Sequence, residues 1–152
     1  MVFSTEALHA VGGFDNALDT GPPLPTGGDI DIFYRVLRAG YRLVYLPGLL
    51  AHHEHRRDMA GLRAQYFTWG QGVAVVARKN ARADPSMRQR QNRMLRRWFR
   101  GMLHQLLLAV ARRDVPCLAN LFAELRGGVV GYLGEYERSQ VRIAIRKREH
   151  GA

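Results

Sequence analysis

Two aspartates stand at the start of a short helical pattern, and their positions suit acid–base chemistry. They lie in the run Gly27-Gly28-Asp29-Ile30-Asp31, after which apolar residues recur at helical spacing as far as Leu37. Asp29 marks the boundary between loop and helix, where a carboxylate either caps the helix or faces a ligand from which it can remove a proton. Asp31 precedes Arg35 by four residues, and the alternative for this residue is a surface ion pair within the helix.

A second group of polar residues occupies positions 51–58 and contains three histidines within four positions, His52, His53 and His55, together with Glu54. Imidazole and carboxylate groups are ligands for ions such as Mn and Zn, so this group is a candidate metal cluster. In a strand, His53 and His55 share one face and His52 points the other way, so at most two of them could converge with Asp29. The alternative is a solvated strand end.

The elements that would position these groups are predicted as loop, helix, turn and strand. Six glycines and prolines within residues 15–28 exclude regular structure there. Gly40 follows the helical pattern at the place of a left-handed cap, and residues 41–47 then alternate as a strand does. A short helix over residues 5–10, with Thr5 as its N-cap, is predicted before the loop.

Helical patterns fill most of the remaining chain. Residues 59–79 place apolar side chains on one stripe, which Gly70 and Gly72 interrupt in a way that permits close packing or a bend. Asp84-Pro85-Ser86 marks a boundary after this helix. The basic tail, residues 138–150, is weakly patterned, and we expect it to fray.

The strongest periodic signal lies between residues 86 and 113, where no acid occurs. One face carries apolar residues, and arginines cover the rest; the apolar set is Met94, Leu95, Trp98, Phe99, Met102, Leu103, Leu106 and Val110. Such a helix suits a membrane interface, and it equally suits packing on the domain with its arginines in water. A further helix is predicted over residues 115–126, capped by Asp114 and stopped by Gly127-Gly128.

Composition limits the class of protein. The 152 residues are 47% hydrophobic and 24% charged, which is ordinary for one folded unit. The net charge of +10 arises after residue 50, because residues 1–50 hold three basic and five acidic side chains. We expect the basic part to bind an anionic partner, although nucleic acid is unfavoured because the basic segments lack interleaved aromatic residues.

The single cysteine, Cys117, excludes an internal disulfide. No secretion signal or membrane span is indicated, so we expect a cytoplasmic protein.

Three patches in order resemble the C-terminal half of a family 2 glycosyltransferase with the GT-A fold. They are Val11-Gly12-Gly13-Phe14-Asp15, then residues 27–41 around Asp29, then Tyr45-Leu46-Pro47 with His53-Glu54-His55-Arg56. The resemblance covers residues 1–80 and implies an α/β, Rossmann-like half domain there. Residues 81–152 would form a basic helical extension.

This resemblance implies roles for individual residues. Asp29 aligns with the general base of an inverting transfer from a nucleotide sugar to a hydroxyl of a saccharide or lipid-linked acceptor. Gly27, Gly28 and Asp31 belong to the acceptor loop, His53 aligns with a residue that helps hold a divalent cation, Mn or Mg, and His55 or Arg56 would lie near the leaving diphosphate.

The sequence also departs from the family pattern. The usual glutamate before the base is Gly28, and the run Gln65-Tyr66-Phe67-Thr68-Trp69 has Thr68 where processive members have arginine, so no processive polymerase is predicted. No donor-binding half with a metal-gripping DxD motif is present, and we expect a fragment or truncated gene product that binds nucleotide sugars poorly alone. The alternative hypothesis is a non-catalytic basic module that uses residues 86–113 to bind a partner protein or the anionic inner face of a membrane.

Overall fold

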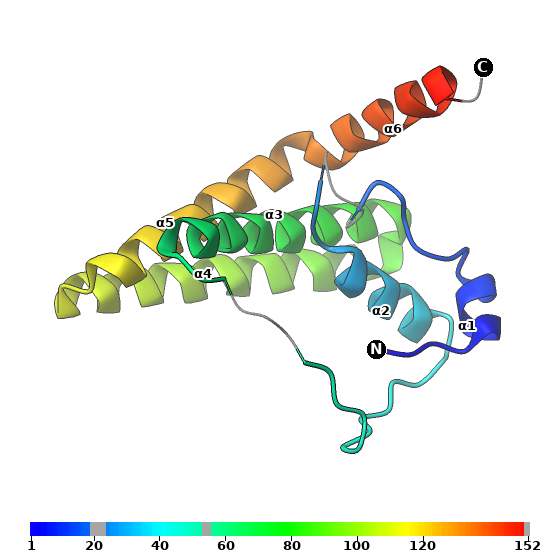
Figure 1. Ribbon diagram of the computed structural model, residues 1–152, viewed down its shortest axis with the longest axis horizontal. Helices are drawn as coiled ribbons and strands as arrows, with labels where there is room; N and C mark the ends of the chain where they lie inside the picture. The colour runs from blue at the N-terminus through cyan, green and yellow to red at the C-terminus, as the bar shows by residue number, and fades with distance from the viewer. Residues whose placement is uncertain (19–23, 53–55, 151–152) are drawn as a thin grey trace.

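The computed structural model describes residues 1–18, 24–52 and 56–150, and Figure 1 shows a bundle of long helices with two short ones at its side. The elements are α1 (Thr5–Ala10), α2 (Gly28–Arg38), α3 (Met59–Ala83), a 3-10 turn η1 (Pro85–Met87), α4 (Arg88–Arg112), α5 (Val115–Val130), an irregular turn η2 (Gly131–Glu135) and α6 (Tyr136–His150). Helices α3, α4 and α5 pack on one another, α2 contacts α3, and α6 extends away from the bundle. None of the described helices is long and apolar enough to cross a membrane.

The predicted α/β, Rossmann-like fold is wrong, because the described residues form helices and no strand. Residues 41–47, expected to be a strand, run without regular structure below the bundle (Figure 1). A strand needs a neighbour to accept and donate its backbone hydrogen bonds, and no described segment pairs with this one. Residue 80 falls inside α3, and the division into parts 1–80 and 81–152 stays a prediction.

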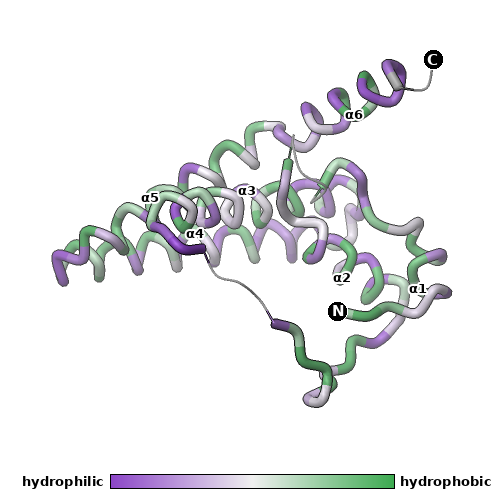
Figure 2. Tube along the Cα trace, viewed as in Figure 1, coloured by the Kyte–Doolittle hydropathy of each residue, from purple (hydrophilic) through white to green (hydrophobic). Residues whose placement is uncertain are grey.

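Residues 41–50 therefore leave an apolar surface in water. Five of these side chains are more than half exposed, namely Val44, Tyr45, Leu46, Leu49 and Leu50. Figure 2 shows this segment largely in the hydrophobic colour, away from the bundle. A contiguous apolar surface of this kind is typical of an interaction site.

Local signals placed α1, α2 and the α4–α5 turn correctly. The range of α1 is as predicted, but the predicted N-cap Thr5 is wrong, because Ser4 caps the helix by accepting the Ala7 N–H at 3.2 Å. Gly40 ends α2 with φ 90°, as predicted, and the Tyr41 N–H closes the cap by donating to the Val36 carbonyl at 3.2 Å. Asp114 caps α5 by accepting the N–H of Cys117 at 3.0 Å, which confirms that prediction.

The helices α3 and α5 touch backbone to backbone through glycines. A Cβ atom at Gly70 would overlap the carbonyl oxygen of Glu124, and one at Gly127 would overlap the carbonyl oxygen of Phe67. At the start of η2, directly after α5, a Cβ at Gly131 would lie 2.5 Å from the carbonyl oxygen of Gln71. Small residues at such a contact allow two helix backbones to approach closely. Of the two outcomes that Gly70 permits, close packing or a bend, the chain therefore forms the close packing.

Replacing Gly127 by alanine is expected to destabilise the protein although alanine is the better helix former. The new methyl group must displace the α3 backbone, and overpacking of this kind costs about 1–3 kcal/mol or more. The matched control is Gly101→Ala in α4, where a Cβ has no neighbour within 4 Å. That control should raise stability by about 0.5–1 kcal/mol. Urea denaturation followed by circular dichroism compares the two, and equal stabilities would contradict the close contact.

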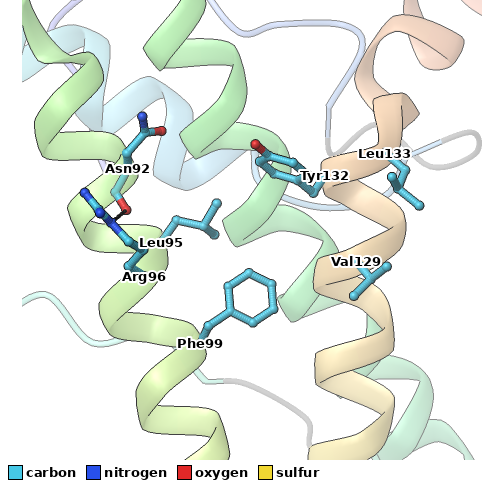
Figure 3. Close-up of a pocket in the computed structure, with 7 residues that line it drawn as sticks. All are labelled: Asn92, Leu95, Arg96, Phe99, Val129, Tyr132 and Leu133. Carbon is cyan, nitrogen blue, oxygen red and sulfur yellow. Dashed lines mark hydrogen bonds between the residues drawn. The ribbon is translucent and has the colours of Figure 1, made fainter.

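The predicted stop of α5 at Gly127-Gly128 is wrong, because these glycines pack against α3 and the aromatic ring of Trp98 and the helix continues to Val130. The chain bends instead at η2, where Gly134 has φ 102°. The tail was expected to fray, but residues from Tyr136 onward form α6. Figure 3 shows Val129, just before this bend, and Leu133, within it, across from α4.

Helix α4 turns part of its apolar face into the bundle, where Leu95 joins a cluster with Ala74 and Ala77 of α3. Trp98, beside this cluster, donates from Nε1 to Oε1 of the buried Glu124 at 3.3 Å. Burial raises the pKa of the Glu124 carboxyl above its ordinary value, and the Trp98 hydrogen bond opposes this only in part.

Glu124 is consequently expected to make the fold less stable as the pH rises. A carboxyl whose folded-state pKa is raised contributes stability that is fully present below its unfolded pKa and is lost as the pH rises through its folded pKa. Glu124→Gln removes this titration and should flatten the stability curve above about pH 4.3, the ordinary glutamate value. Thermal melts of both proteins between pH 4 and 7 measure the effect. The same slope in both would show that Glu124 does not cause it.

Candidate functional site

The loop before α2 is fixed on α3. The Thr26 hydroxyl donates to the carbonyl oxygen of Thr68 at 2.8 Å, and Gly72 leaves the space that this threonine fills, since a Cβ there would lie 2.5 Å from Thr26 Oγ1. Gly27 follows with φ 87°, a conformation that glycine adopts without strain, and α2 begins at the next residue. These contacts set where the first turn of α2 lies against α3.

A cavity of about 450 Å³ opens between this turn and α3, and Asp29 lines it. The other lining residues come from the chain start, the loop, the segment before α3 and α3 itself, and are Met1, Pro25, Thr26, Gly27, Ile30, Arg56, Gln65, Thr68, Trp69 and Val73. Asp29 is exposed, and its Oδ1 accepts the Ile30 N–H at 2.7 Å. The cavity therefore joins a carboxylate, a guanidinium and the half-exposed ring of Trp69.

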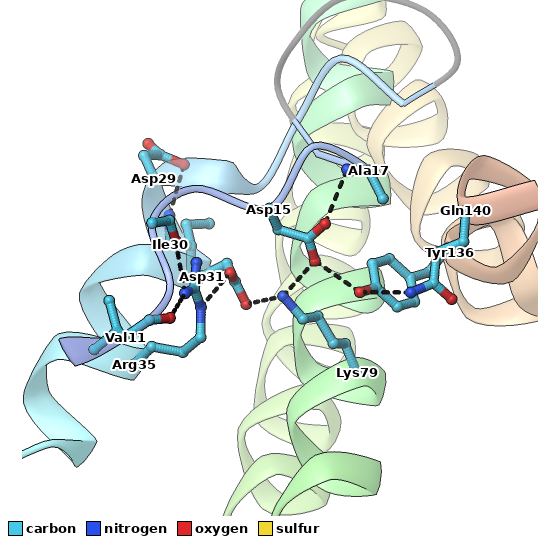
Figure 4. A network of polar contacts seen from close by, with 11 residues as sticks. Val11, Asp15, Ala17, Asp29, Ile30, Asp31, Arg35, Lys79, Tyr136 and Gln140 are labelled. Atoms are coloured by element: carbon cyan, nitrogen blue, oxygen red, sulfur yellow. Dashed lines mark hydrogen bonds and ion pairs between the residues drawn. The ribbon is translucent and has the colours of Figure 1, made fainter. Parts of the chain in front are cut away.

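Asp31 does not line this cavity and lies instead in a buried ionic network (Figure 4). Its Oδ2 accepts from Arg35 Nε at 2.8 Å, and its Oδ1 accepts from Lys79 Nζ at 2.7 Å. The predicted pair with Arg35 is confirmed, but the expectation of a surface pair is wrong, since Asp31 has no exposed area. Buried charges need such partners because desolvation of a lone charge costs several kcal/mol.

The network continues to Asp15, at the end of the Gly12-Gly13-Phe14-Asp15 segment. Lys79 Nζ lies 2.6 Å from Asp15 Oδ2, and the Tyr136 hydroxyl donates to the same oxygen at 2.7 Å. Burial alone would raise the pKa of Asp15, but the bonds from Lys79 and Tyr136 outweigh it and hold that pKa below its ordinary value. Burial, with the Asp15 contact, raises the pKa of Tyr136 well above its ordinary value.

Arg35 ties this segment to α2 from the other side. Its Nη1 donates to the carbonyl oxygens of Val11 at 2.6 Å and Gly13 at 2.8 Å. The network thus links the segment before the loop, α2, α3 and the start of α6, and it holds the helix that presents Asp29.

The structure brings together some of the predicted site residues. Asp29, Gly27 and Arg56 line one cavity, whereas Gly28 is buried in the first turn of α2. His53 and His55 lie outside the described residues. Among the residues that the structure describes, no three His, Cys, Asp or Glu side chains come together as a metal site would require.

Two residues of the site region are not predicted by the sequence to belong to it. Lys79 is one of two lysines in the chain and follows the apolar run that ends at Ala77, a pattern that could have marked a buried partner for an acid. Trp69 was assigned to an apolar stripe, but it is half exposed and lines the cavity.

Comparison with known proteins finds a partial similarity. The pre-mycofactocin glycosyltransferase of Mycobacterium tuberculosis, in strains CDC 1551 / Oshkosh and ATCC 25618 / H37Rv, is 32% identical to this chain over 77 residues. The matched part is 51% of this chain and 15% of the relative, so the chain spans a small part of the length of the curated relatives it matches. No family model matches the sequence, and no solved structure matches it.

Proposed function

We propose that this chain forms the acceptor side of a glycosyl-transfer site, in which Asp29 is the general base of an inverting reaction. The observation that carries this proposal is the cavity that joins Asp29 with Arg56 and Trp69. The similarity to a protein named a glycosyltransferase supports glycosyl transfer in general. The nucleotide-sugar donor, the saccharide or lipid-linked acceptor and the inverting mechanism are parts of the proposal.

The cavity supplies groups suited to each part of the reaction. The Asp29 carboxylate takes the proton of the acceptor hydroxyl as its oxygen bonds to the anomeric carbon of the donor. The bond from that carbon to the diphosphate breaks, and its electron pair leaves with the phosphate oxygen. Arg56 stabilises the negative charge that develops on the diphosphate, and a guanidinium suits phosphate because it donates two parallel hydrogen bonds.

Other lining groups suit a sugar. The exposed ring of Trp69 offers an apolar face, and the Gln65 amide and Thr68 hydroxyl offer hydrogen bonds of the kind that orient a polar ligand. The Thr68 hydroxyl donates to the Gln65 carbonyl at 2.9 Å and keeps lone pairs that can accept from a sugar hydroxyl.

A divalent cation, Mn or Mg, belongs to the proposal only through the resemblance and His53. Asp29 is the single carboxylate among the described residues that line the cavity, and Arg56, which lines the same cavity, repels a cation. The described residues alone do not fit a divalent ion, so no step above uses one.

Contact with the inner face of a membrane through residues 86–113 also stays a prediction. Leu95 and Ala109 are buried in the bundle, in line with the packed-helix alternative for α4. Leu103, Leu107 and Val110, near its far end, are exposed and remain open to another surface.

Arg56→Gln tests the assignment of the donor diphosphate. In a protein that joins this chain to a family 2 donor-binding half, the change should lower the rate of sugar transfer about 100-fold, because one donor to the developing charge is lost. Arg57→Gln is the matched control, since the neighbouring arginine does not line the cavity. Initial rates of nucleotide release measure both. Equal losses in the two variants would count against a specific role for Arg56.

A further inference from the structure

An apolar cavity of about 460 Å³ lies between α4 and the bend after α5 (Figure 3). Its walls are the side chains of Leu95 and Phe99 on α4, and of Val129 and Leu133 on the other side. Arg96 and Asn92 stand on its α4 rim. The volume falls in the range of about 300–1,000 Å³ that is usual for small-molecule sites.

A second cavity, of about 370 Å³, adjoins the first and has a different character. The two share Asn92, Leu95 and Tyr132, and the second is otherwise lined by residues of α3 and the start of α4 that include Arg78, Arg82 and Arg88. The apolar cavity and the cavity lined by cationic side chains therefore share part of their walls. Neither has an acidic lining residue among those that the structure describes.

These arginines are only partly neutralised. Arg78 and Arg82 both pair with Glu137 of α6, and Arg78 also donates to the Tyr132 carbonyl. Arg88 and Arg96 form no ion pair with any described acid, and each donates from Nε to a backbone carbonyl, at 3.4 and 3.3 Å respectively. The region keeps a positive charge that suits an anion.

We propose that the two cavities together bind a single-chain amphiphile that ends in a phosphate group. Its hydrocarbon chain would cover Leu95, Phe99 and Val129, and burial of that surface is favourable in proportion to its area. Its phosphate would meet Arg88 in the cationic cavity, because charge-assisted hydrogen bonds from guanidinium to phosphate are strong and directional. Arg96, on the rim of the apolar cavity, would add positive charge that attracts the same group. Neither a free phosphate nor a neutral chain satisfies both cavities.

This site is separate from the one that contains Asp29. The Asp29 cavity uses Gln65, Trp69 and Val73 of α3, whereas the cationic cavity uses Ala77 and Ala81 with Arg78 and Arg82, further along the helix. The two cavities share no lining residue, and the parts of α3 that line them, residues 65–73 and 77–82, follow one another along the helix. The inference therefore stands or falls independently of the proposed transfer reaction.

Calorimetric titration with lauroyl lysophosphatidic acid below its micelle concentration tests the site. The double variant Arg88→Gln/Arg96→Gln should weaken binding about 10-fold or more, since a charge-assisted contact and a second nearby positive charge are lost. The matched control is Arg93→Gln/Arg97→Gln, which removes the same charge from the same helix at positions that line neither cavity. It should change the affinity by less than about twofold at moderate salt, where exposed charges are screened. Equal losses in the two double variants would overturn the proposal, because only general attraction would remain.

Titrations with two other ligands test whether the phosphate and the hydrocarbon chain are both needed for binding. Inorganic phosphate and neutral dodecyl maltoside should each bind at least about 10-fold more weakly than the lysophospholipid, because each engages one cavity only. Equal binding of either ligand would overturn the assignment of an amphiphile. Val129→Trp fills the apolar chamber and should abolish lysophospholipid binding while the helical circular dichroism is kept. Unchanged binding by this variant would show that the ligand's hydrocarbon chain binds elsewhere, and it would also overturn the proposal.

Discussion

Replacing Lys79 by methionine should lower the free energy of unfolding by about 3–5 kcal/mol, the usual cost of leaving a buried charge without its partner. Lys79 Nζ lies 2.6 Å from Asp15 and 2.7 Å from Asp31, and the Asp31 carboxylate is fully buried. Methionine keeps most of the apolar stem, so the loss reports the missing ammonium group. Urea denaturation followed by circular dichroism at neutral pH measures it.

Lys147→Met is the matched control, because Lys147 is the other lysine and its side chain is exposed on α6. Its stability should stay within about 0.5 kcal/mol of the parent. If Lys79→Met were as stable as Lys147→Met, the buried network would not hold the fold as we describe.

The pH dependence of the free energy of unfolding provides a second test of the same network. The pKa of Asp15 is held below its ordinary value, so its contribution is present at neutral pH and is lost as the pH falls through its folded-state pKa. In Lys79→Met the strongest partner that lowers this pKa is gone, and burial, which raises it, remains. Asp15 should therefore lose less stability on acidification in the variant, and the stability curve should be flatter on its acid side, which urea denaturation at several pH values below neutral measures.

Local elements of the fold could be predicted because their causes lie within a few residues. The apolar spacing of α2 and the glycine at its end, Gly40, act within the helix itself, as does the cap of α5 by Asp114. The 25-residue α4 was predicted for the same reason, since its apolar and basic faces repeat along the chain.

Features that depend on distant residues could not be predicted in this way. Residues 41–47 alternate as a strand does, but a strand forms only beside another, and no described segment provides one. The pair Gly127-Gly128 predicts a helix stop by residue type, whereas in the structure these glycines contact Phe67 and Trp98, which sequence spacing does not show. Tertiary packing here overrides the local preference of glycine.

Some residues of the candidate site can likewise be predicted from the sequence, and others depend on distant parts of the chain. Asp29 and Arg56 were singled out by residue type and resemblance, and the structure places both in one cavity. The pair of Asp31 with Arg35 follows from their spacing within one helix. Its link through Lys79 to Asp15 and Tyr136 joins four separate parts of the chain, and no periodic signal marks it.

Asp29→Asn should lower the rate of sugar transfer about 10²- to 10⁴-fold, the usual contribution of a general base. The amide has nearly the shape of the carboxylate, and its oxygen can still accept the Ile30 N–H, so α2 keeps its start. What the variant loses is a group that can take the acceptor proton. Binding of the acceptor should change little, because the hydrogen bonds that hold the ground state remain.

The most direct test of the account is a single-turnover rate of sugar transfer in a protein that joins this chain to a family 2 donor-binding half. Three proteins are compared: the parent, Asp29→Asn, and Glu6→Gln, which removes an exposed carboxylate outside the cavity. We predict that Glu6→Gln transfers sugar at the parent rate and that Asp29→Asn is slower by at least about 100-fold. Equal rates for Asp29→Asn and the parent would contradict the assignment of Asp29 as the base and of this cavity as the site of transfer.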